Sequence, residues 1–180
     1  MSGNNQARSE RLRLELPVVL SLGSNLGDRE ATLREAVAAI AELDGVRVVA
    51  ASGIVETPAL KPHGVDEDAP AYLNAVVALR TRLSPEQLLD AVGAIERDHG
   101  RVREERWGDR TLDVDIVAWG GLRVQTDRLT IPHPRAAGRA FVLAPWLEIE
   151  PNAELGGVLV ADLLVATGET PAPFAAEPLL

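Results

Sequence analysis

The order of the apolar segments is the feature that most constrains the fold of this chain. Four segments rich in apolar and β-branched residues alternate with two segments of helical periodicity, in the order β-α-β-β-α-β. The predicted strands span Pro17–Leu22, Val46–Glu56, Tyr72–Thr81 and Thr111–Trp119. This order is typical of the split βαβ, or ferredoxin-like, arrangement. It predicts an α+β sandwich, in which an antiparallel sheet carries helices packed on one face and C-terminal additions supply further cover.

Both predicted helices have recognisable ends. The first is expected from about Asp28 to Leu43, with Gly45 as its C-terminal cap. One apolar face at helical spacing is made by Leu33, Val37, Ile40 and Leu43. The second helix begins at Ser84–Gln87, which combines a serine cap, a proline at the first position and a glutamine three residues after the cap. We expect it to end at about Asp98.

The remaining segments carry turn and loop signals. Thr57–Ala71 contains three prolines and a glycine and is predicted to be a long loop, a kind of segment that is often functional. Gly100–Arg110 is a charged, arginine-rich loop, and Ile131–Pro134 is rigid and extended. Leu143–Leu180 is apolar and interrupted by prolines, with a short helix expected around Val160–Ala166.

Length and composition limit the domain organisation and the location. A chain of 180 residues fits one domain, which we place at residues 16–180 after a flexible N-terminal tail at residues 1–15. The tail lacks the apolar stretch of a signal peptide, and no apolar run reaches the roughly 20 residues of a transmembrane helix. Because the chain has no cysteine, thiolate metal sites and cysteine nucleophiles are excluded, and a cytoplasmic location is expected.

The charge distribution indicates the kind of ligand. The formal net charge of −9 argues against broad nucleic-acid binding, which depends on neutralising phosphates with Lys and Arg. Nine of the 18 basic residues nevertheless lie between Arg97 and Arg139, and none follows Arg139. Guanidinium groups bind phosphate oxygens bidentately, so a local arginine cluster on an acidic chain favours a small polyanionic ligand.

Two acidic residues interrupt the fourth predicted strand. Asp113 and Asp115 are two positions apart, so their side chains leave the same face of an otherwise apolar strand. Two close carboxylates repel one another, and a divalent cation relieves that repulsion. Mg²⁺ prefers one or two carboxylates together with phosphate oxygens and water. The alternative is a solvated strand face with two acids, and the motif by itself leaves both interpretations open.

Basic residues lie directly before and after this strand. The preceding loop holds Arg101, Arg103, Arg106 and Arg110, with Trp107 among them, and further donors could come from His133 and Arg139. Arginines beside a paired-carboxylate metal site are the parts of a phosphoryl-transfer centre. The alternative is a solvated loop partly neutralised by Glu104, Glu105 and Asp109. The chain contains neither a GxxxxGK[ST] phosphate loop nor a GxGxxG motif after a strand.

A flat-ring site is suggested by rare aromatic residues. Aromatic residues make up only 3% of the chain, and they include Tyr72 and Phe141. Tyr72 shares a strand face with Asn74, so an aromatic plate lies beside an amide that can donate and accept hydrogen bonds. That pairing suits a flat heterocycle, although a core role is the default for a single aromatic residue.

Four sequence blocks together resemble the 6-hydroxymethyl-7,8-dihydropterin pyrophosphokinase family over about Val18 to Pro151. The blocks are LSLGSNLGDR (Leu20–Arg29), TPAL…YLNAVVAL (Thr57–Leu79), GRVREERWGDRTLDVDI (Gly100–Ile116) and LTIPHPRAAGRAFVL (Leu129–Leu143). The third block is the most specific, because no other family known to us combines it with GSNLGD and IPHP.

The resemblance implies roles for individual residues. The catalytic set would be Arg101, Arg110, Asp113 and Asp115, with the two aspartates holding two Mg²⁺ ions that bridge the phosphates of ATP. The nucleotide side would include Glu96, Arg103, Trp107, Ile116, His133 and Arg139. The pterin would contact Thr57, Pro58, Leu60, Tyr72, Asn74 and Phe141, with Tyr72 and Phe141 on either side of its ring.

The implied reaction is attack of the pterin hydroxymethyl oxygen on the β-phosphorus of ATP, which gives the pterin diphosphate and AMP in tetrahydrofolate biosynthesis. No general base is assigned. The expected partners are these two small molecules, without nucleic acid or membrane, and the expected state is a monomer. A non-catalytic ferredoxin-like binding module and a metal-dependent phosphohydrolase built on the same two aspartates are the alternatives, and AMP formation that depends on added pterin distinguishes all three.

Overall fold

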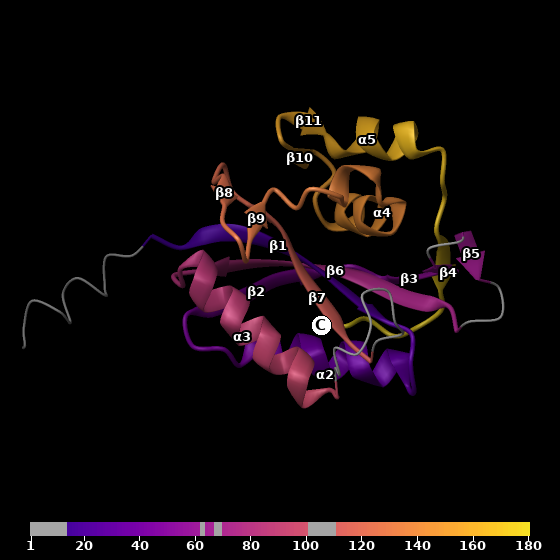
Figure 1. The fold of residues 1–180 in the computed structure, drawn as a ribbon, viewed down its shortest axis with the longest axis horizontal. Helices are drawn as coiled ribbons and strands as arrows, with labels where there is room; N and C mark the ends of the chain where they lie inside the picture. Colours follow the sequence, from indigo (N-terminus) through magenta and orange to yellow (C-terminus); the bar gives the residue numbers. More distant parts are fainter. Residues whose placement is uncertain (1–13, 62–63, 67–69, 101–110) are drawn as a thin grey trace, which may run out of the picture.

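The structure is a computed structural model that describes residues 14–61, 64–66, 70–100 and 111–180. Its centre is an antiparallel sheet between two layers of helices (Figure 1). In spatial order the strands are β12 (Ala172–Phe174), β3 (Ile54–Thr57), β6 (Tyr72–Thr81), β1 (Leu16–Ser24) and β7 (Asp113–Trp119), and β2 (Val46–Ala51) also pairs with β6. The predicted α+β class and the antiparallel sheet are therefore confirmed.

Two helices cover one face of this sheet, as predicted. α2 (Arg29–Ala41) begins at Asp28, whose carboxylate accepts a hydrogen bond from the amide of Ala31 at 3.0 Å. α3 (Pro85–Asp98) begins with the predicted capping box, in which Ser84 and Gln87 bond each other's backbone amides.

The predicted end of the first helix is wrong by two residues. α2 ends at Ala41 with Glu42 as its C-cap, and Gly45 lies three residues further on, in the turn before β2. Its φ of 79° explains why glycine occupies that turn.

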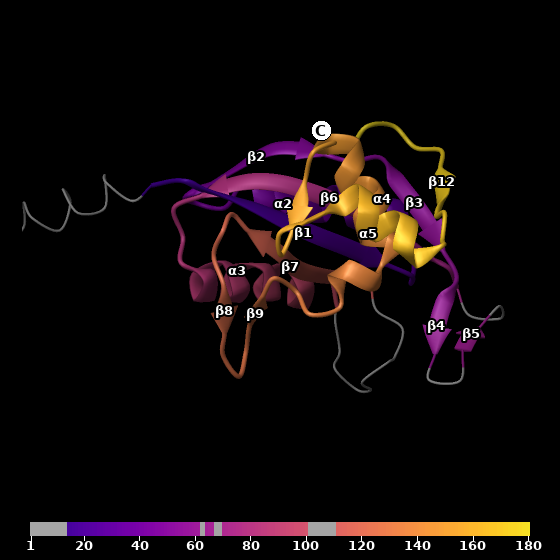
Figure 2. The same ribbon diagram turned by 90° about the horizontal axis from the view of Figure 1, so that it is seen from above.

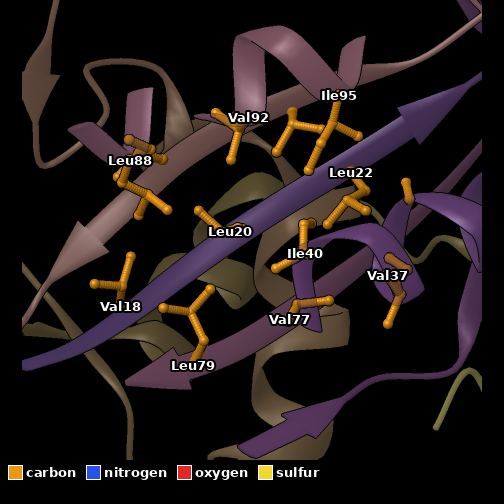
Figure 3. Close-up of a cluster of buried hydrophobic side chains, with 14 of the residues drawn as sticks. Val18, Leu20, Leu22, Val37, Ile40, Val77, Leu79, Leu88, Val92 and Ile95 are labelled. Atoms are coloured by element: carbon orange, nitrogen blue, oxygen red, sulfur yellow. The ribbon is translucent and has the colours of Figure 1, made fainter. Parts of the chain in front are cut away.

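The first hydrophobic core lies between the sheet and these two helices (Figure 3). Alternate residues of β1, namely Val18, Leu20 and Leu22, point into it and meet apolar residues of both helices. The helical contributors include Val37, Ile40, Leu88, Val92 and Ile95. The predicted apolar helix faces are thus the faces that pack on the sheet.

The second face of the sheet carries helices that the sequence did not reveal or revealed only in part. α4 (Ala140–Ile149) and α5 (Val160–Thr167) lie on this side (Figure 1). α5 confirms the short helix expected around Val160–Ala166, whereas α4 was missed because Pro145 lies inside it. Beneath α4 the sheet presents Val19, Val76 and Val117, which form the second core with Leu143.

One predicted strand is broken in two. Val46–Glu56 was expected to be continuous, but β2 and β3 are separated by Ser52 and Gly53. The backbone amide of Ser52 donates to the carbonyl of Val76 at 2.9 Å, and its hydroxyl accepts from the amide of Val76 at 2.9 Å. One backbone bond and one side-chain bond from Ser52 to β6 therefore replace regular pairing at the break.

Short ladders occupy several connections. The predicted loop Thr57–Ala71 contains the pair β4 (Ala59–Lys61) and β5 (Gly64–Asp66), so its expected lack of regular structure is corrected in part. The other short elements are β8 (Val124–Gln125) with β9 (Thr130–Ile131), the 3₁₀ turn η1 (Ala136–Gly138), and β10 (Glu154–Leu155) with β11 (Val158–Leu159).

The C-terminal residues return along the edge of the sheet. After α5, β12 pairs with β3, and the chain then reaches the α2 side, where Arg34 donates to the carbonyls of Glu177 and Pro178 (Figure 2). Phe174 and Leu179 pack against the first core. Within the described residues, no helix is long and apolar enough to cross a membrane.

Candidate active site

The second face of the sheet has an apolar end and a polar end on the same three strands. The apolar end, defined above by Val19, Val76 and Val117, lies under α4. Further along the same strands the residues on this face form the polar end, which consists of Ser21, Gly23, Tyr72, Asn74, Asp113 and Asp115. In the sheet register, Gly23 lies opposite Asn74 on one side and Asp113 on the other, and Ser21 lies opposite Asp115.

The two aspartates leave β7 on this face, and basic groups from a later segment meet them. Asp113 and Asp115 are half-buried, and the side chain of Asp115 is 32% exposed. Arg139 places Nη1 3.3 Å from Asp115 Oδ2, and His133 places Nε2 3.8 Å from the same oxygen. Residues about 20 positions apart in the sequence thus form one charged cluster.

The ring of His133 is held in a defined orientation. It follows the cis peptide bond between Ile131 and Pro132, and its backbone amide donates to the carbonyl of Val117 at 2.9 Å. Its Nδ1 accepts a hydrogen bond from the amide of Arg135 at 3.2 Å, so the neutral ring carries its hydrogen on Nε2, which faces Asp115. Burial lowers the pKa of His133, opposed by the carboxylate of Asp115.

Arg139 links the acidic cluster to an aromatic ring. It precedes α4, and its guanidinium carbon lies 5.6 Å from the ring centroid of Phe141, within the range of a cation–π contact. Burial lowers the pKa of Arg139 and Asp115 raises it, but a guanidinium stays charged at neutral pH. The start of α4 therefore supplies both a cation and a flat apolar surface.

Glu96 supports the aspartate strand from the opposite side. It lies near the end of α3, is 6% exposed, and accepts a hydrogen bond from the amide of Val114 at 2.8 Å. Val114 stands between the two aspartates, so this carboxylate holds the strand at the point where both leave it. The structure thus places Glu96 behind the acidic pair.

The amide of Asn74 is oriented by two neighbours. Its Nδ2 donates to Thr57 Oγ1 at 2.9 Å, which joins β6 to β3. A methyl group at Gly23 would lie 3.1 Å from Asn74 Oδ1 and 3.7 Å from a ring carbon of Tyr72. Close packing therefore favours glycine at this position, because any larger side chain would displace the amide of Asn74.

The remaining predicted site residues are distributed as follows. The side chain of Ile116 is 3% exposed and points into the first core. Only the backbone of Ile116 faces away from that core. Pro58 is exposed between β3 and β4, and Leu60 belongs to β4. Arg101, Arg103, Trp107 and Arg110 lie outside the described residues.

The residues present fit a divalent cation of the hard type. The described part of the chain holds no group of three or more His, Cys, Asp and Glu placed for a metal. Mg²⁺ is commonly held by one or two carboxylates, with waters and phosphate oxygens completing its shell. The pair Asp113 and Asp115, half-buried and on one strand face, matches that pattern.

Sequence reasoning missed one group on the α2 side of the sheet, opposite the face that carries the polar end. Arg29, at the start of α2, donates from Nη1 to Glu56 Oε1 at 2.9 Å and to the carbonyl of Ala71 at 2.7 Å. In the sequence, Arg29 is notable only as the last residue of the block LSLGSNLGDR. No local pattern pairs it with residues 27 and 42 positions away.

Solved structures with the same fold include Plasmodium falciparum HPPK-DHPS. The triple mutant S436F/A437G/A613T of that protein superposes with a TM-score of 0.65 at 13% identity, over 85% of this chain. This chain matches 43% of that longer one, so it spans less than half of the solved protein. At this identity the likeness establishes the fold alone.

Sequence comparison identifies the family. Residues 19–151 match the family model described as 7,8-dihydro-6-hydroxymethylpterin-pyrophosphokinase (HPPK). The 2-amino-4-hydroxy-6-hydroxymethyldihydropteridine pyrophosphokinase of Methylorubrum extorquens is 46% identical over 145 residues, which are 81% of this chain and 89% of that protein. The Bacillus subtilis protein of the same name is 45% identical over 130 residues, 72% of this chain and 75% of that one. The chain belongs to the 7,8-dihydro-6-hydroxymethylpterin-pyrophosphokinase family.

Proposed function

We propose that this chain transfers the pyrophosphoryl group of ATP to 6-hydroxymethyl-7,8-dihydropterin, the reaction for which its family is named. The supporting observation is the polar end of the sheet, where two carboxylates, two basic groups and an amide beside an aromatic ring gather on one face. A phosphate-binding half and a flat-ring half thus lie side by side on three adjacent strands.

The carboxylate half is assigned to metal and triphosphate. Asp113 and Asp115 would hold two Mg²⁺ ions, which neutralise charge on the phosphates when bound. Glu96 keeps the strand in place through Val114. His133 and Arg139 are assigned to the nucleotide as hydrogen-bond donors, which suits the Nε2–H of His133 and the permanent charge of Arg139.

The amide half is assigned to the pterin. Asn74 and Thr57 are already bonded to one another, which leaves Asn74 Oδ1 and its second amide hydrogen to read the hydrogen-bonding edge of a heterocycle. Tyr72 and Phe141 would stack on the two faces of the ring, with Pro58 and Leu60 beside it. Stacking of this kind contributes about 0.5–1.5 kcal/mol beyond the area that it buries.

The chemical step needs alignment more than bond-making groups from the protein. The hydroxymethyl oxygen of the pterin attacks the β-phosphorus of ATP, a new P–O bond forms, and the bond from that phosphorus to the α,β-bridging oxygen breaks to release AMP. The hydroxyl proton leaves to solvent, and no general base is assigned. Residues of the polar end hold the two substrates in line, and Arg101 and Arg110 are assigned to clamp the transferred group.

The wider setting is part of the same proposal. We infer a monomer in the cytoplasm, with residues 16–180 as a single domain and small molecules as the only partners. The single domain is supported by the C-terminal residues Phe174 and Leu179, which pack against the same core as β1.

The decisive experiment is to incubate the protein with Mg-ATP and 6-hydroxymethyl-7,8-dihydropterin and to follow AMP. AMP and the pterin diphosphate should form in equal amounts, and only when the pterin is added. Phosphate or diphosphate released without pterin would support a phosphohydrolase instead, and ligand binding without any turnover would support a binding module. The assignments of Arg103 and Trp107 are tested in the same assay, by the effect of replacing each residue on the KM for ATP.

A further inference from the structure

One arginine outside the polar end ties together the two ends of a long excursion of the chain. Between β3 and β6 the chain leaves the sheet after Thr57 and returns at Tyr72. Arg29 bonds both flanking residues with a single nitrogen, because Nη1 donates to Glu56 Oε1 at 2.9 Å and to the carbonyl of Ala71 at 2.7 Å. The side chain of Arg29 is only 26% exposed, which reduces competition from water.

A second contact from the same connection strengthens this attachment. Asn25, between β1 and α2, is 1% exposed, and its Nδ2 donates to the carbonyl of Pro70 at 3.3 Å. One side chain from the turn before α2 and one from the first residue of α2 therefore bond the consecutive carbonyls of Pro70 and Ala71. These carbonyls directly precede the start of β6.

The held residues are neighbours of the proposed pterin contacts. Glu56 precedes Thr57, and Ala71 precedes Tyr72. Thr57 and Tyr72 are themselves the last register pair of the short ladder between β3 and β6, which has only three pairs. The last pair of a short ladder is the one most exposed to fraying, so an added bond just outside it has a direct effect on that pair.

Arg29 does not lie on the face of the sheet where the pterin is proposed to bind. Side chains alternate along a strand, so Glu56 points to the α2 side of the sheet while Thr57 points to the opposite, polar side. Arg29 belongs to α2 and meets Glu56 on that side. Any effect of Arg29 on the pterin must therefore pass through the backbone of residues 56, 57, 71 and 72.

We propose that Arg29 is a positioning residue for pterin binding, which fixes the distance between Thr57 and Tyr72 by bonding Glu56 and the carbonyl of Ala71. This inference rests on the proposed function, because it takes Thr57, Tyr72 and Asn74 as the pterin contacts. It assigns no role to Arg29 towards ATP, since the two aspartates leave β7, on the far side of β1 from the ladder of β3 and β6.

The chain offers a matched control in the same helix. Arg34 makes the same kinds of contact, with a carboxylate, Glu30, at 2.8 Å and with two backbone carbonyls, those of Glu177 and Pro178. Its side chain is 32% exposed, close to the 26% of Arg29. Its carbonyl partners lie in the C-terminal segment, away from Thr57 and Tyr72. Arg34→Met therefore removes an equivalent set of bonds without releasing the ladder.

The test compares Arg29→Met, Arg29→Lys and Arg34→Met in the full chain. The dissociation constants of 6-hydroxymethyl-7,8-dihydropterin and of a non-hydrolysable Mg-ATP analogue are measured separately by calorimetry, and steady-state kinetics gives KM and kcat. We expect Arg29→Met to raise the pterin Kd and KM about tenfold, as the loss of a charge-assisted hydrogen bond would, with the analogue Kd and the kcat changed less than about twofold.

Arg29→Lys should recover most of the pterin affinity, because one amino group can donate to both acceptors, as Nη1 does. Arg34→Met should leave both dissociation constants unchanged. If Arg29→Met fails to fold, Glu56→Ala removes one of the two bonds. It should give a smaller rise in the Kd of the pterin and leave the Kd of the ATP analogue unchanged.

The inference is overturned if Arg29→Met binds the pterin as the wild type does, if both ligands weaken equally, or if Arg34→Met produces the same loss. A wild-type protein that binds Mg-ATP but not the pterin would instead reject the proposed function, so the two failures are distinguishable.

Discussion

The two ends of the second sheet face differ in chemistry although they share β1, β6 and β7. At the apolar end, valines from the three strands pack under α4 and are at most 6% exposed. A few residues further along the same strands, the side chains on this face are serine, glycine, asparagine and aspartate. The face therefore changes from a core to a candidate site within the length of one strand.

This difference separates the residues of the face that stabilise the fold from the residues that are proposed to bind ligands. Alternation places every second residue of a strand on this face, and the sequence decides for each whether it is buried or serves a ligand. Arg139 and Phe141 mark the boundary, because Arg139, the N-cap of α4, pairs with Asp115, while Phe141 in the first turn contacts the guanidinium of Arg139 and packs against the second core. The helix that completes the second core thus also delivers two of the proposed site residues.

The largest effect is expected when a carboxylate is removed from the polar end. Asp115→Ala should lower kcat by more than about 10³-fold, because the charge of the metal and triphosphate loses one of two protein ligands. Its stability without ligands should change by about 1 kcal/mol or less, since its ion pairs are partly exposed.

AMP formation at saturating Mg²⁺ measures the activity, and urea unfolding measures the stability. Asp162→Ala, an exposed acid on α5, is the control. Near wild-type turnover in Asp115→Ala would reject the metal assignment.

Removing a core side chain tests the other end. Leu143 is fully buried in the second core, and Leu143→Ala should cost about 2–5 kcal/mol of unfolding free energy. Leu88→Ala, equally buried in the first core, should cost a similar amount.

If the apolar end serves stability alone, Leu143→Ala should bind the pterin and the ATP analogue normally at temperatures where it remains folded. A selective loss of ligand affinity in Leu143→Ala, absent from Leu88→Ala, would show that α4 couples the two ends.

A methyl group added to the polar end should have a smaller and more local effect. In Gly23→Ala the new Cβ would lie 3.1 Å from Asn74 Oδ1, so the Asn74 side chain must move by a few tenths of an ångström. We expect pterin affinity to fall by roughly threefold to thirtyfold, the equivalent of about 0.7–2 kcal/mol, while ATP affinity holds. Gly121→Ala, where the Cβ would have no neighbour within 4 Å among the described residues, is the matched control. Unchanged pterin binding would remove Asn74 from the proposed contacts.

Most of the fold was predictable from local signals. Tyr72–Thr81 has the predicted bounds, and the serine cap at Ser84 starts α3 as expected. The errors occur where long-range contacts decide. Pro145 argues locally against a helix, but α4 forms because its apolar side chains pack on the sheet. β12 consists of Ala172, Pro173 and Phe174, a segment that no local pattern marks as a strand, and it exists because β3 offers an edge.

The candidate site was predictable in its residue types rather than in its geometry. Alternation placed Asp113 and Asp115 on one face and Tyr72 with Asn74 on one face, as the register has them. It could not show that these two pairs face the same side, because that depends on the sheet register, in which Gly23 lies opposite both Asn74 and Asp113. The contacts of His133 and Arg139 with Asp115, and of Arg29 with Glu56, required the tertiary structure.

The smallest expected effect concerns the pH dependence of stability at the polar end. Burial lowers the pKa of His133 in the folded protein below the ordinary value of about 6.5. As the pH falls below about 6.5, the unfolded chain takes up a proton at this ring before the folded protein does, so the free energy of unfolding falls with decreasing pH until the folded pKa is passed. In His133→Asn, Oδ1 can still accept the hydrogen bond from the amide of Arg135, but no proton is taken up. Chemical unfolding without metal, measured in steps from pH 8 to pH 5, should therefore give a shallower decline for His133→Asn than for the wild type. Parallel curves would mean that His133 titrates alike in the folded and unfolded chain. In Asp115→Asn the decline should become steeper than in the wild type, because the carboxylate of Asp115 raises the pKa of His133 and its loss leaves the effect of burial less opposed. A shallower decline in Asp115→Asn would contradict this account of the polar end.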